Sequence, residues 1–379
     1  MTFSSPSFSS HAPMKIGFVG CGQITEVHRD GYRLFGLPVV AGTDVSAEAR
    51  EKFQSQDPQA RVYESLDELL GDPEIEVFDV AAPHRQDIRE PLLEKVVRAG
   101  KPVLLQKPFA HAYEDALRYT RLFEDAGVPL MINQNSVFSG GVIEMTDRVL
   151  RSQEMGRLLC GRITNMYDFD PGDHPWYGKN ARWWLTDMAV HEMALLHHFL
   201  GAPESVSAAW GRDPAQKGVR GDGFFQIFHR YADGSSALIN ESGAYYGQEH
   251  LSCGFELQGE SGILEIITGK QAVLSRRGEP KLEILSPYRW FPEAFGLVMH
   301  HFQHALRAGA QPLCSSLDNL YVIATIEAAY RSAETGRSVR LGEIMGDRYD
   351  GQHGPGGLAG LSEWTAPVPN LKATLIRNY

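Results

Sequence analysis

The sequence has few cysteines, no surplus of basic residues and no long apolar run. Its 379 residues include four widely separated cysteines, without paired spacing: Cys21, Cys160, Cys253 and Cys314. This excludes a zinc knuckle and a disulfide framework, and we expect a reducing, cytoplasmic location. Because 47 acidic residues outnumber 36 basic ones, giving a net charge of -11, neither nucleic acid nor an anionic membrane surface is an expected partner. No stretch approaches the roughly eighteen apolar residues of a membrane span.

The length predicts two domains, because it exceeds what one ordinary hydrophobic core can organise. Residues 1–13 are rich in Ser and Pro, lack Lys and Arg, and have no apolar core of the kind that secretory signals carry, so we expect a disordered leader. A first domain is predicted over residues 14–134 and a second over 135–341. The Gly- and Pro-rich residues 342–379 are expected to be a disordered tail or an arm over a neighbouring subunit.

The first domain opens with a strand, a glycine turn and a helix. The apolar run 15–20 leads into Gly20 and Gly22, and a helical stretch follows. The first glycine suits a tight turn and the second lets backbone approach a pyrophosphate at the helix N-terminus. Thr25 replaces the usual third small residue, so this is a two-glycine version of the dinucleotide fingerprint. The predicted cofactor contacts of this turn are Gly20, Gly22, Gln23 and Ile24.

Asp44 ends the second predicted strand, about twenty residues past the glycine turn. A carboxylate at this point can accept hydrogen bonds from both ribose hydroxyls of NAD. It would repel the 2′-phosphate of NADP unless a basic residue compensated, and Arg50 is the nearest candidate. The sequence therefore favours NAD over NADP.

Further strand-like and helical runs alternate up to residue 134, which predicts an α/β fold with a doubly wound parallel sheet. The apolar run 103–105 is typical of a strand buried on both faces, and Lys107 falls at its carboxyl end. Ligands bind at that edge of open α/β sheets. A lysine whose charge simply reaches solvent is the alternative.

The second half changes character. Strand-like segments follow one another with few helices between them, which predicts an α+β domain with a large, mostly antiparallel open sheet. Before those strands, residues 183–201 are predicted to form one helix, in which Asp187 and His191 are four positions apart. That spacing places both on one helical face, where the carboxylate can orient an imidazole that acts as a base. An N-terminal acid with a core histidine is the alternative. A metal site would need a third ligand beside Asp187 and His191, and the sequence does not place one, so no metal is expected.

Aromatic side chains gather in the sequence just before this helix. Flat rings suit the C–H faces of a sugar ring, and a neighbouring arginine suits its hydroxyls. Trp183 and Trp184, at the start of this helix, could instead be core anchors. The candidate substrate-binding residues are Tyr167, Trp176, Tyr177, Arg182 and Trp183.

Three segments give the chain a resemblance to a known family. They are residues 16–22 with His28 after them, the segment 99–108 ending in Gln106-Lys107-Pro108, and Asp187 with His191. They resemble the glucose–fructose oxidoreductase, inositol dehydrogenase and MocA (Gfo/Idh/MocA) family. Two departures stand out: Gln106 replaces the family's glutamate, and Ala82-Pro83-His84 replaces a Thr-Pro-Asn loop.

The resemblance implies hydride transfer at a sugar or polyol carbon. It implies that Lys107 contacts the reacting hydroxyl, that His191 is the general base and that Asp187 supports it. It also implies cofactor contacts from Pro83, Gln106 and Lys107, and a homodimer or homotetramer assembled through the open sheet. We therefore expect an NAD-dependent dehydrogenase of a sugar, glycoside or cyclitol. A non-catalytic dinucleotide-binding sensor or scaffold and an NADP-linked reductase are the alternatives.

Overall fold

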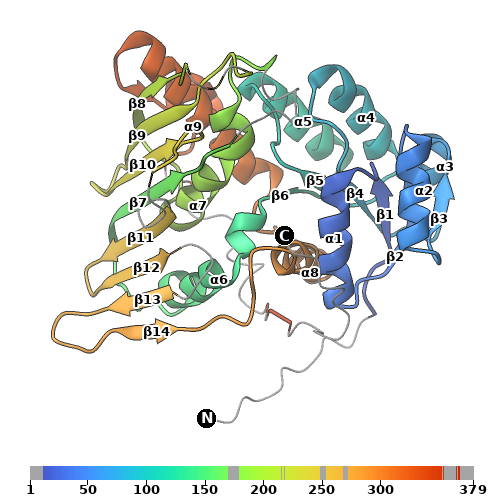
Figure 1. Cartoon of the computed structure of the whole chain (residues 1–379), viewed down its shortest axis with the longest axis horizontal. Coiled ribbons are helices and arrows are strands. Elements are labelled where there is room, and N and C mark those ends of the chain that lie inside the picture. Colours follow the sequence, from blue (N-terminus) through green and yellow to red (C-terminus); the bar gives the residue numbers. More distant parts are fainter. Residues whose placement is uncertain are drawn as a thin grey trace.

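The computed structural model describes residues 12–169, 179–214, 216, 218–247, 253–267, 272–351, 353, 364 and 366–367. Two sheets lie on opposite sides of the molecule, and helices α6, α7 and α9 lie between them (Figure 1). One sheet has six strands and the other has nine. This arrangement confirms the predicted fold class: a doubly wound parallel sheet followed by a mostly antiparallel open sheet.

The first sheet has the strand order β3-β2-β1-β4-β5-β6, and every neighbouring pair is parallel. Its strands are β1 Ile16–Val19, β2 Val39–Thr43, β3 Arg61–Tyr63, β4 Val77–Val80, β5 Val103–Gln106 and β6 Leu130–Asn133. Its helices are α1 Gln23–Leu34, α2 Ala47–Gln56, α3 Leu66–Leu70, α4 Gln86–Arg98 and α5 Tyr113–Ala126. The strand order reverses between β1 and β4, which is where ligands bind in folds of this kind.

The central strands are buried on both faces, as their continuous apolar runs predicted. All residues of β1, β4 and β6 are buried, and β5 is buried up to its last residue, Gln106. Side chains that follow these strands therefore leave the core at one common edge of the sheet.

The second sheet has the order β14-β13-β12-β11-β7-β10-β9-β8-β15, and only the β7–β10 pair is parallel. Its strands are β7 Leu158–Met166, β8 Ser205–Gly211, β9 Phe224–Arg230, β10 Ser236–Ser242, β11 Cys253–Gly259, β12 Ile263–Ile267, β13 Ala272–Ser275, β14 Leu282–Ile284 and β15 Val339–Arg340. The helical elements of this half are a 3₁₀ turn Asn135–Phe138, α6 Gly140–Thr146, a π-helical turn Asp147–Arg151, a second π-helical turn Trp184–Met188, α7 Val190–Leu200, α8 Glu293–Ala308, α9 Ser316–Thr335, α10 Gly342–Met345 and a 3₁₀ turn Gly346–Arg348.

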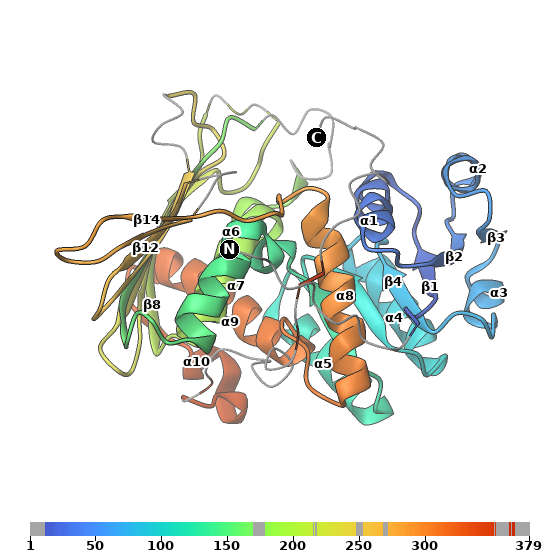
Figure 2. The same ribbon diagram turned by 90° about the horizontal axis from the view of Figure 1, so that it is seen from below.

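Helices α6, α7 and α9 lie on one face of the nine-stranded sheet, and no described helix lies on the other face (Figure 2). The strand β9 alternates between buried and exposed residues, as a half-covered strand should. Large apolar side chains are partly exposed on neighbouring strands of this sheet: Trp210, Phe228 and Leu238.

Helix α8 returns from the second half of the chain and packs against α1 of the parallel sheet (Figure 2). Two glycines allow the close approach: a Cβ on Gly296 would lie 2.4 Å from the backbone oxygen of Gly31. The two halves therefore share an interface at backbone distance. Among the described residues, no helix has both the length and the apolar character needed to cross a bilayer.

Several details differ from the prediction. The short strands β3 and β13 had no signal of their own, because each is only three or four residues long. The described part of the C-terminal segment packs on the fold. Residues 342–345 form α10, and the Trp364 side chain is buried against Phe138 and His301. An isolated aromatic among glycines and prolines gave no periodicity from which this packing could be inferred.

Candidate active site

The glycine turn lies at the point where the parallel sheet reverses its strand order. Gly20 has φ +96°, and a Cβ there would lie 3.0 Å from the backbone of Ala81 and Ala82. Gly22 precedes α1, where a Cβ would meet nothing within 4 Å, and no side chain caps the helix. Its first turn thus presents backbone N–H groups at an open surface, which fits the pyrophosphate of a dinucleotide.

Asp44 lies directly beside this turn. Its Oδ2 accepts a 2.7 Å hydrogen bond from the Cys21 N–H, and its Oδ1 accepts one of 2.8 Å from the Ser46 N–H. The Arg50 guanidinium donates to the Asp44 backbone oxygen at 2.7 Å. The arrangement leaves a half-buried acid next to the glycine turn, as a ribose-binding residue requires.

Lys107 follows β5 and points toward the second half of the molecule. Its Nζ donates a 2.6 Å hydrogen bond to the backbone oxygen of Asp187. Burial lowers the pKa of this lysine, and the negative charges of Asp187 and Glu192 oppose that shift. The lysine is half-buried and bonded across the interface between the two halves of the chain. The alternative of a lysine that extends into solvent is therefore wrong.

His191 is in the first turn of α7. Its ring lies edge-on to Trp290, with 6.1 Å between the ring centroids, and its Nδ1 has no hydrogen-bond partner among the described residues. Burial lowers the pKa of His191 well below its usual value, and the charge of Lys107 adds to that shift. The imidazole is thus neutral at neutral pH and able to accept a proton.

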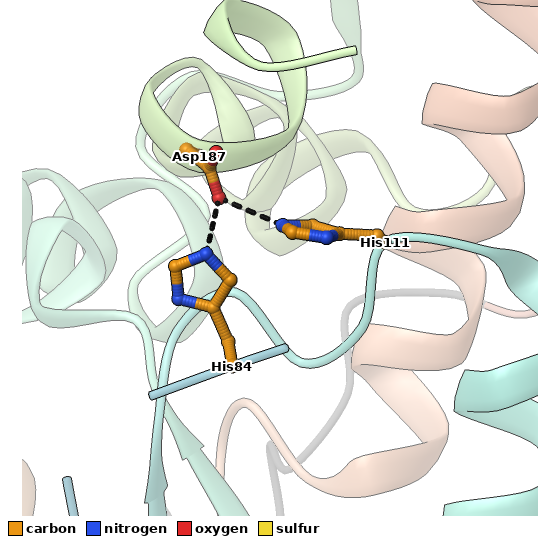
Figure 3. Close-up of side chains that lie close together, drawn as sticks. All are labelled: His84, His111 and Asp187. Carbon is orange, nitrogen blue, oxygen red and sulfur yellow. Dashed lines mark hydrogen bonds and ion pairs between the residues drawn. The ribbon is translucent and has the colours of Figure 1, made fainter. Parts of the chain in front are cut away.

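The predicted pairing of Asp187 with His191 is wrong. The Asp187 Oδ1 instead lies 3.1 Å from His84 Nε2 and 3.0 Å from His111 Nε2 (Figure 3). The physical reason is local geometry. Asp187 is in the π-helical turn Trp184–Met188, whereas His191 is in α7, so the α-helical spacing assumed for one continuous helix does not apply.

Burial by itself would raise the pKa of Asp187. The hydrogen bonds from His111 and His84, and the charge these histidines carry when protonated, outweigh burial and hold that pKa below its usual value. Burial lowers the pKa of His84, against the opposing effect of Asp187. The carboxylate is therefore ionised, buried, and approached by two imidazoles.

His84 and His111 were not assigned a role from the sequence. His84 follows β4 and His111 follows β5, and these strands are parallel neighbours. That placement was the available signal, because residues that follow adjacent parallel strands meet at the same edge of a sheet. Their distance in sequence from Asp187 concealed the contact.

Arg89 of α4 is a third residue that sequence reasoning missed. It is buried, and it donates hydrogen bonds to the backbone oxygens of Ala82, Gln106, Pro108 and Phe109. Burial lowers its pKa to about 10. The guanidinium thereby ties together the loops after β4 and β5, which carry His84, Lys107 and His111.

Two predicted cofactor contacts lie at the same edge. Gln106 is half-buried, and its Oε1 has no hydrogen-bond partner within the part of the chain that the structure describes. Pro83 is exposed at the end of β4. A buried acceptor without a hydrogen-bond partner destabilises the fold, and a bound ligand that donates to the Gln106 Oε1 would remove that cost.

The predicted aromatic substrate site is only partly supported. Trp183 is fully buried and packs on Trp184 and Phe169, so its assignment to substrate is wrong and it is a core residue. Arg182 is engaged by two carboxylates of α9, those of Glu327 and Glu334. Its charge is already paired, and its assignment to substrate hydroxyls stays a prediction. Tyr167 is half-buried near Trp184. Trp176 and Tyr177 lie outside the described residues.

The parallel sheet, the glycine turn and the adjacent Asp44 define a dinucleotide-binding Rossmann domain. Comparison with known proteins agrees. Residues 14–134 match the model of the oxidoreductase family with an NAD-binding Rossmann fold, and residues 143–265 match that of the Gfo/Idh/MocA C-terminal domain. The chain belongs to the Gfo/Idh/MocA oxidoreductase family, as its resemblance implied, and is an NAD(P)-dependent oxidoreductase.

Relatives with named activities cover most of the chain. It is 26% identical to a D-apiose dehydrogenase from Paraburkholderia graminis over 342 residues, which are 86% of this chain and 89% of the relative. It is 25% identical to a 1,5-anhydro-D-fructose reductase from Ensifer adhaerens over 86% of this chain and 98% of that protein. A levoglucosan dehydrogenase solved with NADH and levoglucosan superposes with a TM-score of 0.77 at 18% identity, over 87% of this chain and all of that one. At that identity, the likeness establishes the fold alone.

Proposed function

We propose that this protein is an NAD-dependent dehydrogenase that oxidises a secondary or anomeric hydroxyl of a sugar, glycoside or cyclitol. One observation carries the proposal. Lys107 and His191, which come from different halves of the chain, lie at the carboxyl edge of the parallel sheet, and the charge of the lysine acts on the imidazole. Relatives whose names specify sugars and sugar derivatives support the substrate class.

The cofactor is proposed to lie across the switch point of the sheet. Its contacts would come from the glycine turn, from Asp44 and from the ends of β4 and β5: Gly20, Gly22, Gln23, Ile24, Asp44, Pro83, Gln106 and Lys107. Bound there, a nicotinamide ring supplies the hydride acceptor. The Asp44 carboxylate, with Arg50 held at its backbone oxygen, favours NAD over NADP.

His191 is proposed to take the proton of the reacting hydroxyl. Its neutral imidazole and the unpaired Nδ1 suit that role. Lys107 would polarise the same oxygen with its positive charge, and Asp187 would act as a positioning residue that fixes the lysine through its backbone oxygen. In the reduction direction, His191 returns the proton.

Two further features belong to the proposal. Tyr167 is the described aromatic candidate for packing on the sugar ring, and Trp176 and Tyr177 stay candidates. A homodimer or homotetramer would form through the open sheet, whose outward side chains include Trp210, Phe228 and Leu238. Covering these partly exposed apolar groups would stabilise such an assembly.

The proposal is tested with a panel of sugars, glycosides and inositols, monitored by the absorbance of reduced nicotinamide. The panel is run in both directions and with NAD and NADP. We expect turnover of at least one compound, with NAD preferred. Dinucleotide binding without any turnover, together with a co-purifying protein, would instead favour a non-catalytic sensor.

The assignment of residues is tested with Lys107→Met and His191→Asn. Each is expected to lower kcat by about 10²–10⁴-fold. His191→Asn should leave the dissociation constant for NAD nearly unchanged, whereas Lys107→Met also removes a proposed cofactor contact and should raise it modestly. Lys101→Met is a matched control. It removes a lysine from just before β5, at the amino end of the strand, where its Nζ donates to the backbone oxygen of Asp72 at 2.6 Å. Normal turnover in Lys107→Met or His191→Asn would refute the assignment.

A further inference from the structure

We propose that His84, His111 and Asp187 form a binding site for a divalent transition-metal ion of the zinc type. The three residues come from separate segments: the loop after β4, the loop after β5 and the π-helical turn before α7. Metal binding at this triad goes beyond the proposed dehydrogenase function and does not depend on it.

The spacing of the three ligand atoms suits one ion. The Asp187 Oδ1 is 3.1 Å from His84 Nε2 and 3.0 Å from His111 Nε2. For metal–ligand bonds of about 2.1 Å, two ligand atoms lie about 3.0 Å apart at adjacent octahedral positions and about 3.4 Å apart at tetrahedral ones, so a shift of a few tenths of an ångström would adapt the triad to tetrahedral zinc. The two imidazole planes are inclined at 78°, with ring centroids 4.7 Å apart, so their nitrogens approach from different directions (Figure 3).

The donor set selects the kind of ion. Two imidazole nitrogens and one carboxylate oxygen suit zinc, iron, cobalt or nickel, whereas magnesium and calcium prefer oxygen ligands alone. Three protein ligands on one side of an ion leave further positions open, as catalytic metal sites require.

A second observation points to a missing ligand. The Asp187 Oδ2 is buried and has no hydrogen-bond partner among the described residues. A buried anionic oxygen without a partner is costly, and a cation bound at the same carboxylate through Oδ1 would reduce that cost. Lys107 does not fulfil this role, because its Nζ is bonded to the backbone oxygen of Asp187.

The surroundings would hold the ligands while leaving a way in. Arg89 fixes the backbone of the loops after β4 and β5 through hydrogen bonds to Ala82 and Phe109, which are close in sequence to the two histidines. The side chain of His84 is 17% exposed and that of His111 is 29% exposed, so an ion can enter from solvent.

The test is a titration of the full-length protein, first stripped with a chelator, with Zn²⁺ alone in a calorimeter. Co²⁺ replaces Zn²⁺ in a parallel experiment that records its visible absorption. We expect one equivalent of either ion to bind the wild-type protein, and we expect His84→Gln and His111→Gln each to weaken that binding at least about tenfold. Mg²⁺ should bind far more weakly.

His353→Gln is the matched control, since it alters a second cluster of two histidines and an aspartate and should leave the affinity unchanged. Melting temperatures and NAD affinity establish that the variants fold. The proposal is overturned if Zn²⁺ shows no saturable binding, which is the result expected for a triad held only by hydrogen bonds. It is also overturned if binding persists in both His84→Gln and His111→Gln. Because binding is measured without turnover, a substrate panel that fails leaves this result intact.

Discussion

Two clusters in this molecule contain the same side chains, two histidines and one aspartate, but differ in what the carboxylate does. In the first, both histidines approach Asp187 Oδ1, and Asp187 Oδ2 has no partner among the described residues. In the second, Asp318 Oδ2 accepts from the N–H of Ser315 at 2.9 Å and from its hydroxyl at 2.8 Å, which completes the cap of α9.

The histidines of the second cluster are also engaged differently. The ring of His353 stacks on Tyr321, with centroids 4.1 Å apart and planes inclined by 3°, and its Nε2 lies 3.3 Å from Asp318 Oδ1. His197 stacks on the other two rings and lies 3.9 Å from the same oxygen. The carboxylate of the second cluster is therefore part of the fold, whereas that of the first has an oxygen without a partner among the described residues, at the carboxyl edge of the parallel sheet.

The comparison shows that composition alone does not identify a site. What distinguishes a ligand-binding carboxylate from a structural one is whether its oxygens are already used by the chain. Helix α7 joins the two regions, because it carries His191 in its first turn and His197 and His198 in its last. One helix thus separates a reactive end from a packed end.

The largest expected effect comes from changing the two aspartates. Asp187→Asn should lower kcat by about 100-fold or more, because a neutral amide oxygen accepts the two histidine hydrogen bonds more weakly than the carboxylate, so the loops that carry His84 and His111 are held less firmly. Asp318→Asn should leave kcat nearly unchanged and lower the free energy of unfolding by about 1–3 kcal/mol, since it weakens a cap and a buried hydrogen-bonded pair.

The kcat of each variant is measured from initial rates on a substrate identified by the panel. The free energy of unfolding of each variant is measured by urea denaturation. The comparison fails if Asp318→Asn loses activity while it stays stable, or if Asp187→Asn turns over normally.

The sequence predicted those parts of the site that depend on local order along the chain. Gly20, Asp44 and Lys107 each follow a buried strand, and the parallel sheet necessarily brings the ends of its strands to one edge. The partners of Asp187 could not be predicted in this way. They lie 76 and 103 residues away, in the other half of the molecule, and spacing within one helix pointed to His191 instead.

Burial of aromatic residues was equally hard to infer. Trp183 and Tyr167 differ in exposure, but both occur in a segment whose composition suits either a core or a sugar-binding surface. Only the packing of Trp183 on Phe169 and Trp184 decides the matter. The fold class, in contrast, follows from the alternation of strand and helix patterns, which are local.

A smaller effect should appear in the pH dependence of stability at the packed end of α7. Burial lowers the pKa of His198 to about 3, with a further contribution from the charge of His197. The unfolded chain takes up this proton below about pH 6.5, whereas the folded protein does not, so stability is fully present above that pH and is lost as the pH falls toward 3. His198 therefore contributes a slope of up to about 1.4 kcal/mol per pH unit.

His198→Gln should remove that slope. Urea denaturation at pH 7, 6 and 5 is expected to show the wild-type protein losing about 2 kcal/mol more than the variant over this range. The Thr146 hydroxyl is hydrogen-bonded to His198 Nε2 at 2.9 Å, and glutamine retains a polar group for that contact. Parallel curves for the two proteins would mean that His198 titrates equally in both states.

The smallest effect is expected at the reactive end of α7, in the pH dependence of oxidation. The pKa of His191 lies well below its usual value because of burial and the charge of Lys107. The imidazole should therefore stay in its proton-accepting form down to pH 6, so kcat/KM should change less than about twofold between pH 8 and 6 and fall only at lower pH. A histidine with the ordinary pKa of about 6.5 would keep only about a quarter of its activity at pH 6. Such a loss in the wild-type profile would show that burial and the charge of Lys107 do not favour the neutral form of His191.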